Sequence, residues 1–211
     1  MGTNTSLPSF WAETWRQAIS AVMQIRNLNT AFISGCISLQ ILSHVIIFAE
    51  SGIHMKITLL TVGKTDVRWV REGLDLYVSR LIHYVPFQLV EIPELKNVSA
   101  LTKQQIKQKE GELILKQLKS SDEVVLLDEH GREMTSLEFA RAIEGKMSRA
   151  SRDIVFVIGG AYGFSPDVYG RADGKISLSK MTFSHQMVRT IFAEQLYRAF
   201  TIIKGEPYHH E

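Results

Sequence analysis

The segment Ile154-Val155-Phe156-Val157-Ile158-Gly159-Gly160-Ala161-Tyr162-Gly163 joins an uninterrupted apolar run to a glycine-rich turn. A short apolar run bounded by a turn is typical of a strand that is buried on both faces of a parallel sheet. Glycines directly after such a strand let a ligand approach the main chain, because no Cβ stands in the way. The spacing is not the G-x-G-x-x-G of a dinucleotide-binding fold, and the acidic residue that fold needs about 20 positions later is not convincingly placed.

Strand and helix patterns alternate on both sides of this segment, which predicts an α/β fold with helices on both faces of the sheet. Ser136 is a plausible N-cap for the third predicted helix. The predicted strands are Ile57–Val62, Phe87–Ile92, Glu123–Leu127, Ile154–Ile158 and Lys175–Leu178, and the predicted helices are Trp69–Leu81, Lys103–Leu118, Ser136–Met147 and His185–Ile203.

The composition indicates a folded protein without a disulfide framework. Apolar residues make up 45% of the 211 residues, enough to bury a core. The formal net charge is only +2, so nucleic-acid binding would have to come from clustered Lys and Arg rather than from the total. The single cysteine, Cys36, excludes an intrachain disulfide and a Cys-rich zinc site, and it favours a reducing cytoplasm.

Residues 1–54 differ in character from residues 55–211, and we expect a boundary between an N-terminal extension and one domain. The extension carries only four charged residues, and its run from Ala31 to Ala49 is uncharged over 19 positions. That length is near the minimum for a membrane span, but polar residues within the run weaken this interpretation. Met55 is an acceptable initiator, so an upstream start codon or an accessory segment explains residues 1–54 more simply than a targeting role.

Polar or glycine-rich turns follow three of the predicted strands, after Leu127, after Ile158 and after Leu178. The carboxyl ends of parallel strands meet at one edge of a sheet, where open α/β folds bind their ligands. We therefore expect these turns to form one ligand site. The alternative is that the glycines only permit a tight turn and that Leu127 belongs to the core.

As a whole, the chain from Met55 to Glu211 resembles the small knotted methyltransferases called ribosomal RNA large subunit methyltransferase H. Each matching motif is weak alone, but their order is highly specific. They are Met55-Lys56-Ile57-Thr58, Val62-Gly63-Lys64, Lys109-Glu110-Gly111, Leu126-Leu127-Asp128, Ile158-Gly159-Gly160, Ser179-Lys180-Met181-Thr182-Phe183, His185-Gln186, Glu194-Gln195-x-Tyr197-Arg198-Ala199 and Pro207-Tyr208-His209.

The resemblance implies a parallel-sheet SPOUT fold with a C-terminal trefoil knot, assembled as a homodimer with its sites near the subunit interface. It also implies methylation of N3 of a pseudouridine in the helix 69 hairpin of 23S rRNA, on the assembled ribosome. S-adenosyl-L-methionine would be the methyl donor, held mainly through main-chain groups and apolar contact. The implied donor-binding residues are Leu127, Gly159, Leu178, Ser179, Lys180, Met181, Thr182 and Phe183.

The C-terminal tail is the candidate for the chemistry at the base. Methylation of N3 requires loss of a weakly acidic N–H proton, so the enzyme chiefly aligns the reactants and favours the deprotonated ring. Tyr208 could stack on or hydrogen-bond the ring, and His209 could accept the proton or stabilise negative charge. The alternative is that these last residues are a frayed C-terminus without a function.

Three further residues on or near the last predicted helix are secondary candidates. Arg189 and Arg198 are nine positions apart, so they do not share one face cleanly; one would face RNA and the other a structural partner. Arg189 is the one that we take as a catalytic candidate beside Tyr208 and His209. Arg198 also stands four residues after Glu194, which predicts a helix-surface ion pair. His185 is a candidate for helix capping as much as for catalysis. No metal is expected, because adjacent histidines on a tail lack a regular ligand geometry.

Three rival functions stay open at the level of sequence. The chain could methylate another nucleotide, such as one in a transfer RNA. It could instead be a ribosome-binding factor that keeps the fold without the activity. A membrane-tethered protein that uses Ala31 to Ala49 is the third alternative.

Overall fold

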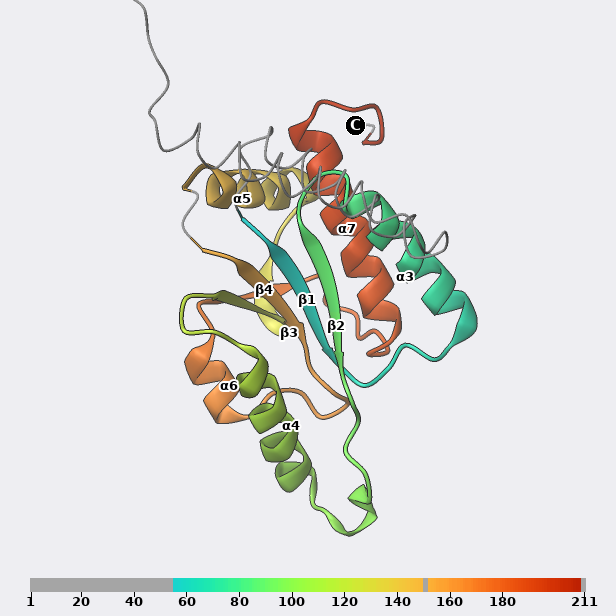
Figure 1. The fold of residues 1–211 in the computed structure, drawn as a ribbon, viewed down its shortest axis with the longest axis vertical. Coiled ribbons are helices and arrows are strands. Elements are labelled where there is room, and N and C mark those ends of the chain that lie inside the picture. Colours follow the sequence, from blue (N-terminus) through green and yellow to red (C-terminus); the bar gives the residue numbers. More distant parts are fainter. Residues whose placement is uncertain (1–54, 150–151, 210–211) are drawn as a thin grey trace, which may run out of the picture. The chain divides into compact units, whose positions relative to one another are not determined.

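The computed structural model describes residues 55–149 and 152–209 (Figure 1). Within these residues one five-stranded sheet has the order β2-β1-β4-β3-β5, and all of its pairings are parallel. A parallel sheet requires crossover connections, and here helices provide them. The strands are β1 Ile57–Val62, β2 Phe87–Ile92, β3 Glu123–Glu133, β4 Ile154–Ile158 and β5 Gly174–Ser177.

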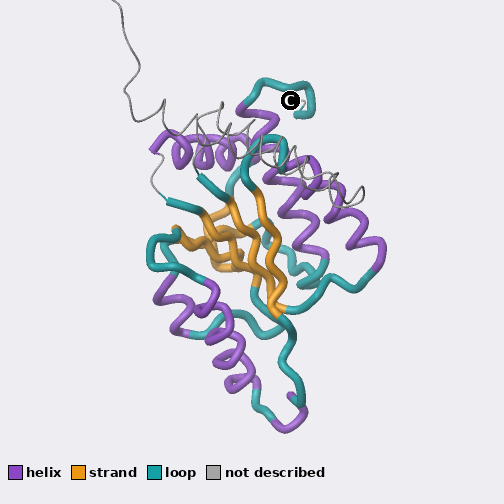
Figure 2. Tube along the Cα trace, in the orientation of Figure 1, coloured by secondary structure: helices purple, strands orange, loops and turns teal. Residues whose placement is uncertain are grey.

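Helices cover both faces of the sheet (Figure 2). On one face α3, α5 and α7 share a core with the sheet, and on the other face α4 and α6 share a second core. The two layers explain why the sequence alternates strands with amphipathic helices. The helices are α3 Arg68–Leu81, α4 Lys103–Gln117, α5 Ser136–Arg149, α6 Pro166–Arg171 and α7 Met187–Ile203.

The two cores follow from the period of two along each strand. In β1, Ile57 and Leu59 pack into the core that contains α7, whereas Leu60 and Val62 pack into the core that contains α4. All five residues of β4 are buried, as expected for a central strand that lies between β1 and β3. The α/β class and the buried central strand predicted from the sequence are therefore confirmed.

Most predicted elements are present, and β1, β2 and β4 have the predicted bounds. β5 runs over Gly174–Ser177, one residue earlier than predicted, and α7 begins at Met187 rather than at His185. The sequence prediction missed α6. The signal for it is local, because the Ser165 side chain accepts a hydrogen bond from the Val168 N–H and a proline follows as the first helical residue.

The N-cap of α5 is Thr135, so the prediction of Ser136 is wrong. The Thr135 hydroxyl accepts a hydrogen bond from the Glu138 N–H at 3.2 Å, and the Glu138 carboxylate accepts one from the Thr135 N–H at 2.8 Å. This reciprocal pair is a capping box. The Ser136 hydroxyl instead donates to Oε1 of Gln195 on α7.

β3 is longer than predicted, because it continues past Leu127 and pairs with β5 a second time. Ile176 of β5 is in register with both Leu127 and Arg132 of β3. The register of the pairing therefore shifts at residues 128–131. A Cβ built on Gly131 would lie 2.4 Å from the Ile176 carbonyl carbon, so only glycine fits where β3 approaches the β5 main chain here.

None of the helices within residues 55–149 and 152–209 is long and apolar enough to span a membrane. The uncharged run from Ala31 to Ala49 and the rest of the predicted extension lie outside the described residues.

Candidate active site

The three predicted turns meet at the carboxyl edge of the sheet and enclose a cavity of about 560 Å³, here called the strand-end cavity. Its walls are the ends of β3, β4 and β5, the turn at residues 159–163, the loop at residues 178–185 and Val188 in the first turn of α7. Figure 1 shows why these segments meet: the parallel strands all end at the same edge, and α7 starts there. Lys107 of α4 closes one side.

Seven of the eight residues that the resemblance assigned to the methyl donor line this cavity. They are Leu127, Gly159, Leu178, Ser179, Met181, Thr182 and Phe183.

Lys180 is the eighth predicted donor residue, and it does not line the cavity. Its side chain is exposed, and its ammonium lies 3.9 Å from a carboxylate oxygen of Glu133. A pair of exposed side chains at this distance contributes little to stability. The loop is held instead from within, because the Ser179 hydroxyl accepts a hydrogen bond from the Met181 N–H at 2.9 Å.

The glycines of the 159–163 turn are required by what packs beneath the turn. A Cβ on Gly159 would lie 3.1 Å from the ring of Phe164, a core residue, and a Cβ on Gly160 would lie 2.5 Å from a carboxylate oxygen of Glu110. Gly163 has φ +80°, which favours glycine. The turn thus exposes main chain to the cavity, but the Cβ of Gly159 would point at Phe164 rather than into ligand space.

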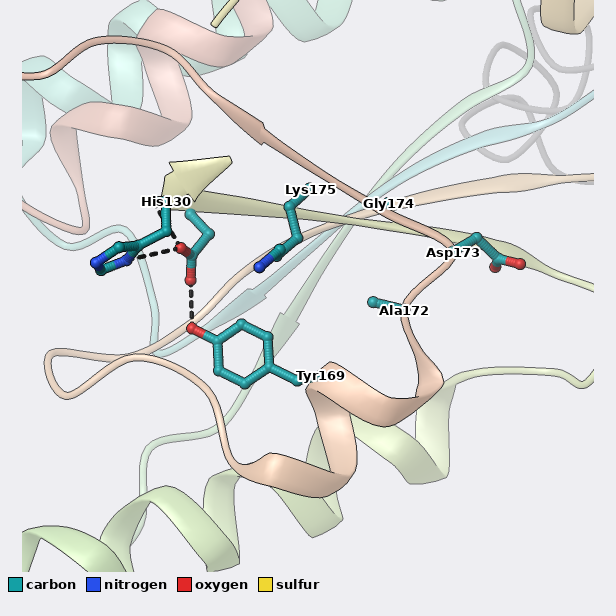
Figure 3. A pocket seen from close by; sticks show the side chains of 7 residues that line it. His130, Tyr169, Ala172, Asp173, Gly174 and Lys175 are labelled. Carbon is teal, nitrogen blue, oxygen red and sulfur yellow. Dashed lines mark hydrogen bonds and ion pairs between the residues drawn. The ribbon is translucent and has the colours of Figure 1, made fainter. Parts of the chain in front are cut away.

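Sequence reasoning missed a polar cluster beside the cavity. The Asp128 carboxylate, whose side chain is only 7% exposed, accepts hydrogen bonds from the Tyr169 hydroxyl and from the His130 N–H at 2.8 Å. These residues also border a second cavity of about 650 Å³, where the Lys175 ammonium lies 5.4 Å from the Tyr169 ring centroid (Figure 3). A polar residue directly after a strand end is the signal that points to Asp128.

Burial and hydrogen bonding shift the two acids of this cluster in opposite directions. Burial alone would raise the pKa of Asp128, but the hydrogen bonds from Tyr169 and His130 bring that pKa below its usual value. Burial and the bond to Asp128 together raise the pKa of Tyr169 to about 12. Asp128 is therefore an anchored carboxylate, and Tyr169 is a hydroxyl that keeps its proton.

Arg189, the catalytic candidate on this helix, does not line the strand-end cavity. It is fully buried, with an exposed fraction of 0%. Its guanidinium donates to the carbonyl oxygens of Val62, Gly63 and His185 at 2.7, 3.0 and 3.0 Å, and to the Thr65 hydroxyl at 2.8 Å. All of these partners belong to the protein, so Arg189 ties the start of α7 to the end of β1.

A carboxylate balances this buried charge. Glu91 Oε1 lies 3.5 Å from Arg189 and also accepts hydrogen bonds from the Thr65 N–H and hydroxyl. Burial lowers the pKa of Arg189 from its usual value, and nearby carboxylates oppose that shift.

Tyr208 packs against the middle of α7. Its hydroxyl lies 3.2 Å from Glu194 Oε1 and 3.5 Å from the Tyr77 hydroxyl, and its ring lies 4.7 Å from the Arg198 guanidinium and 4.8 Å from the Tyr197 ring. Arg198 also forms the predicted ion pair with Glu194, at 2.6 Å. Burial, with the Tyr77 hydroxyl and the Glu194 charge, raises the pKa of Tyr208.

The strand-end cavity reaches only the first turn of α7, whereas Tyr208 packs against the middle of that helix. Its partner Glu194 lies six residues beyond Val188 of the cavity wall, roughly 9 Å along the helix at about 1.5 Å per residue. Figure 1 shows α7 running from the strand-end edge of the sheet to the C-terminus. Within one chain the structure does not bring Tyr208 and His209 to the cavity. His185 does line it.

A metal at the tail is not tested by the described residues, because His210 and Glu211 lie outside them. Among residues 55–149 and 152–209, no group of three or more His, Cys, Asp or Glu side chains is arranged to hold a metal ion.

Comparison with known proteins identifies the family. A family model described as predicted SPOUT methyltransferase matches residues 55–209. Proteins named ribosomal RNA large subunit methyltransferase H from Phocaeicola vulgatus and Parabacteroides distasonis are 57% and 56% identical to this chain over 157 residues. Each alignment covers 74% of this chain and 100% of the relative.

One solved structure is a far more distant match. The SpoU methyltransferase AviRb from Streptomyces viridochromogenes, in complex with AdoMet, aligns with a TM-score of 0.37 and 14% identity, covering 71% of this chain and 58% of AviRb. That likeness is too weak to inform the site. The family model and the close relatives are sufficient, and the chain belongs to the SPOUT methyltransferase family.

Proposed function

We propose that this protein methylates N3 of a pseudouridine in the helix 69 hairpin of 23S rRNA, with S-adenosyl-L-methionine as the methyl donor. The observation that carries the proposal is the strand-end cavity, which is lined by seven of the eight residues that the resemblance assigns to the donor. The relatives' name, ribosomal RNA large subunit methyltransferase H, supports ribosomal RNA as the substrate class.

The cavity fits a ligand that combines an apolar ring with polar groups. Its volume of about 560 Å³ lies in the range of small-molecule sites, about 300–1,000 Å³. Leu127, Ile158 and Ile176 contribute apolar side chains, while the turn around Gly159 and Gly160 exposes main-chain groups. The donor, when bound, supplies an activated methyl group on a sulfonium. The protein's own task is to bind and orient, and main-chain groups do this with little loss of conformational entropy.

The target base must lose the N3 proton as it accepts the methyl group. His209 is the titratable group that we assign to this proton, and Tyr208 is the aromatic group that we assign to stacking on the ring or hydrogen bonding to it. A histidine suits this role because its ordinary pKa of about 6.5 is close to neutral pH. His185 is the titratable candidate that already lines the cavity.

Because Tyr208 does not line the cavity of its own chain, we propose that the tail acts on the cavity of a second subunit. A homodimer supplies the missing group, because each subunit then offers one cavity and one tail. Exposed apolar residues support such an interface: on α3, Trp69 is 62% exposed and Leu76 is 47% exposed. Side chains of this size on an exposed helix face are typical of interaction surfaces.

We propose the C-terminal trefoil knot on the basis of the family match to residues 55–209. We place the methyltransferase domain at residues 55–211 and treat residues 1–54 as an extension, since the family match begins at residue 55.

The proposal places the protein in the cytoplasm, where ribosomes are assembled. A net charge of +2 is small for a protein that grips a large RNA alone. The assembled ribosome, with its shaped surface, would then supply much of the docking energy.

Mass spectrometry of ribosomal RNA from a strain that lacks this protein tests the proposal. Loss of one methyl group from a helix 69 pseudouridine, restored by the gene, is the expected result. Loss of a methyl group from a transfer RNA would establish the rival substrate. Unchanged RNA, together with no incorporation of tritiated methyl groups into ribosomes by the purified protein, would leave the non-catalytic ribosome-binding factor.

A further inference from the structure

A second cavity lies beside the C-terminal tail, at the end of α7 that is remote from the strand-end cavity. We call it the tail cavity. Its volume is about 500 Å³, and its walls come from the end of α3, the residues just after α3, and the end of α7. The residues that line it are Arg80, His83, Tyr84, Tyr197, Lys204 and Glu206.

Arg80 is the central cation of the tail cavity. Its guanidinium carbon lies 5.7 Å from the Tyr77 ring centroid and 5.4 Å from that of Tyr197. Stacking on two aromatic rings orients the planar group and favours its charge. Among residues 55–149 and 152–209, no carboxylate forms an ion pair with Arg80 and no carbonyl accepts a hydrogen bond from it.

The guanidinium is thus oriented by protein contacts while its N–H donors are not consumed by them. This differs from the buried Arg189, whose donors are bonded to the main chain. A fixed fork of N–H groups is suited to two oxygens of one phosphate or carboxylate.

The other charges of the tail cavity favour an anion. Lys204 adds a second cation, and within the described part of the chain it forms no ion pair. The single carboxylate, Glu206, accepts a hydrogen bond from the Tyr84 hydroxyl at 2.5 Å. Burial, together with that bond, raises the pKa of Tyr84, so the hydroxyl stays protonated and keeps donating to Glu206. Two cations therefore face one carboxylate that already has a donor.

We propose that the tail cavity binds a backbone phosphate of the substrate RNA, next to the nucleotide that the same tail presents to the cavity of the second subunit. The proposal rests on the proposed function. Glu206 precedes Tyr208 by two residues, so a group held in the tail cavity lies within one or two nucleotides of a base that contacts Tyr208. Arg80 and Lys204 bind the phosphate, and the tyrosines hold Arg80 in place.

The experiment measures methylation of unmodified ribosomes by full-length variants across a range of salt concentrations. Arg80→Ala is expected to raise KM for ribosomes by about tenfold or more, with kcat changed by less than about twofold and donor affinity unchanged. Arg80→Lys keeps the positive charge but not the planar fork of N–H groups. Its KM for ribosomes should lie between those of the wild type and Arg80→Ala. The slope of log KM against log salt should fall by about 0.7 for each lost phosphate contact.

Matched controls remove a similar charge elsewhere. Arg141→Ala on α5 and Lys116→Ala on α4 change exposed cations that form no ion pair among the described residues, and both should behave as wild type. Lys204→Ala is a second variant for the case in which Arg80→Ala misfolds, since the Lys204 side chain takes no part in the aromatic packing around Arg80. This variant should also raise KM for ribosomes.

Four results would overturn the assignment. KM and salt slopes equal to those of the controls would show that no phosphate is bound there. A fall in kcat with unchanged KM would place Arg80 in the chemical step. Dissociation of the dimer on Arg80→Ala, measured by sedimentation equilibrium, would show that a carboxylate of the second subunit fills the cavity. Wild-type protein that does not methylate ribosomes would remove the proposed function and this assignment with it.

Discussion

Arg189 shows how burial decides what a charged side chain does. Its sequence position, near the start of an apolar helix, is compatible with a substrate contact or with a structural role. In the fold its donors bond to carbonyl oxygens at the end of β1 and Glu91 lies nearby. Removing a buried charge of this kind strongly destabilises the fold. Its former partners are then left without hydrogen bonds in a region of low dielectric.

We predict that Arg189→Met lowers the free energy of unfolding by about 3–5 kcal/mol. Urea denaturation of the wild type and the variant measures this. Arg152→Met, which removes a partly exposed partner of Asp173, should cost about 0–1 kcal/mol. An Arg189→Met protein of wild-type stability that has lost methyl transfer would restore the catalytic interpretation.

Tyr169 makes the stability of the site depend on alkaline pH. Its folded pKa, about 12, is raised above the unfolded value of about 10. A raised pKa contributes stability that is fully present below the unfolded pKa and is lost as the pH rises through the folded pKa. We therefore predict that the stability difference between wild type and Tyr169→Phe is constant from pH 7 to 9 and shrinks between about pH 10 and 12.

Chemical denaturation at a series of pH values measures this difference. Tyr162→Phe is the control, because Tyr162 is exposed and its hydroxyl forms no hydrogen bond within the described residues. A difference for Tyr169→Phe that does not change up to pH 12 would show that the bond to Asp128 contributes nothing to folding.

At the scale of elements, the ends of helices and the close approach of strands are determined by specific contacts. α5 begins where the capping box of Thr135 and Glu138 satisfies free N–H groups. β3 approaches the main chain of β5 at Gly131, which has no side chain. Both are single positions on which a whole element depends.

Thr135→Ala should destabilise the protein by about 1 kcal/mol, because it removes the hydroxyl that accepts the Glu138 N–H. Thermal unfolding is the measurement. Thr135→Ser keeps the hydroxyl and should be nearly neutral. Equal losses for both variants would mean that the methyl group of Thr135, rather than the cap, is responsible.

Gly131→Ala is predicted to cost at least about 1–3 kcal/mol, because the added Cβ meets main-chain atoms of Ile176, which cannot rotate away as a side chain can. Donor affinity should fall with stability, since Ile176 lines the strand-end cavity. Urea denaturation and calorimetric titration with the donor test both effects. Gly170→Ala is the matched control, because a Cβ there meets no atom within 4 Å. Equal stability of the Gly131→Ala variant and that control would exclude this close approach of β3 to β5.

At the scale of the molecule, one chain holds the proposed donor cavity and a tail that do not meet. Their proposed cooperation therefore calls for a second copy of the chain. A division of this kind predicts that the two functions can be lost separately and recovered by mixing.

Deletion of residues 208–211 should leave donor binding nearly intact and lower single-turnover methylation of ribosomes by about a hundredfold or more. Gly160→Val should instead weaken donor binding and leave the tail intact, because its side chain would displace the Glu110 carboxylate beneath the turn and shift a wall of the cavity. Subunits mixed after denaturation and refolding should regain up to about a quarter of wild-type activity, since half of the dimers then carry one complete site. No recovery from correctly mixed dimers would place cavity and tail within one subunit.

The local pattern of the sequence was sufficient for the elements and for the turns that enclose the strand-end cavity. Apolar runs with a period of two or 3.6 depend only on neighbouring residues, and β1, β2 and β4 accordingly have the predicted bounds. The turns at Leu127, Gly159 and Leu178 could be predicted to meet because the carboxyl ends of parallel strands share one edge.

Only the tertiary structure decided what depends on residues far apart in the chain. Arg189 is buried by contacts with residues 62–65, more than 120 positions earlier, and Tyr208 is held against the middle of α7 by Glu194 and by Tyr77 of α3. Asp128 is anchored as a carboxylate by a hydrogen bond from Tyr169, 41 positions away. Such contacts have no period along the sequence, because they arise when the sheet brings distant segments together. The sequence alone therefore determined the class of fold and the turns that meet at one cavity, and the packing of α7 decided which of its charged and aromatic residues remain available for RNA.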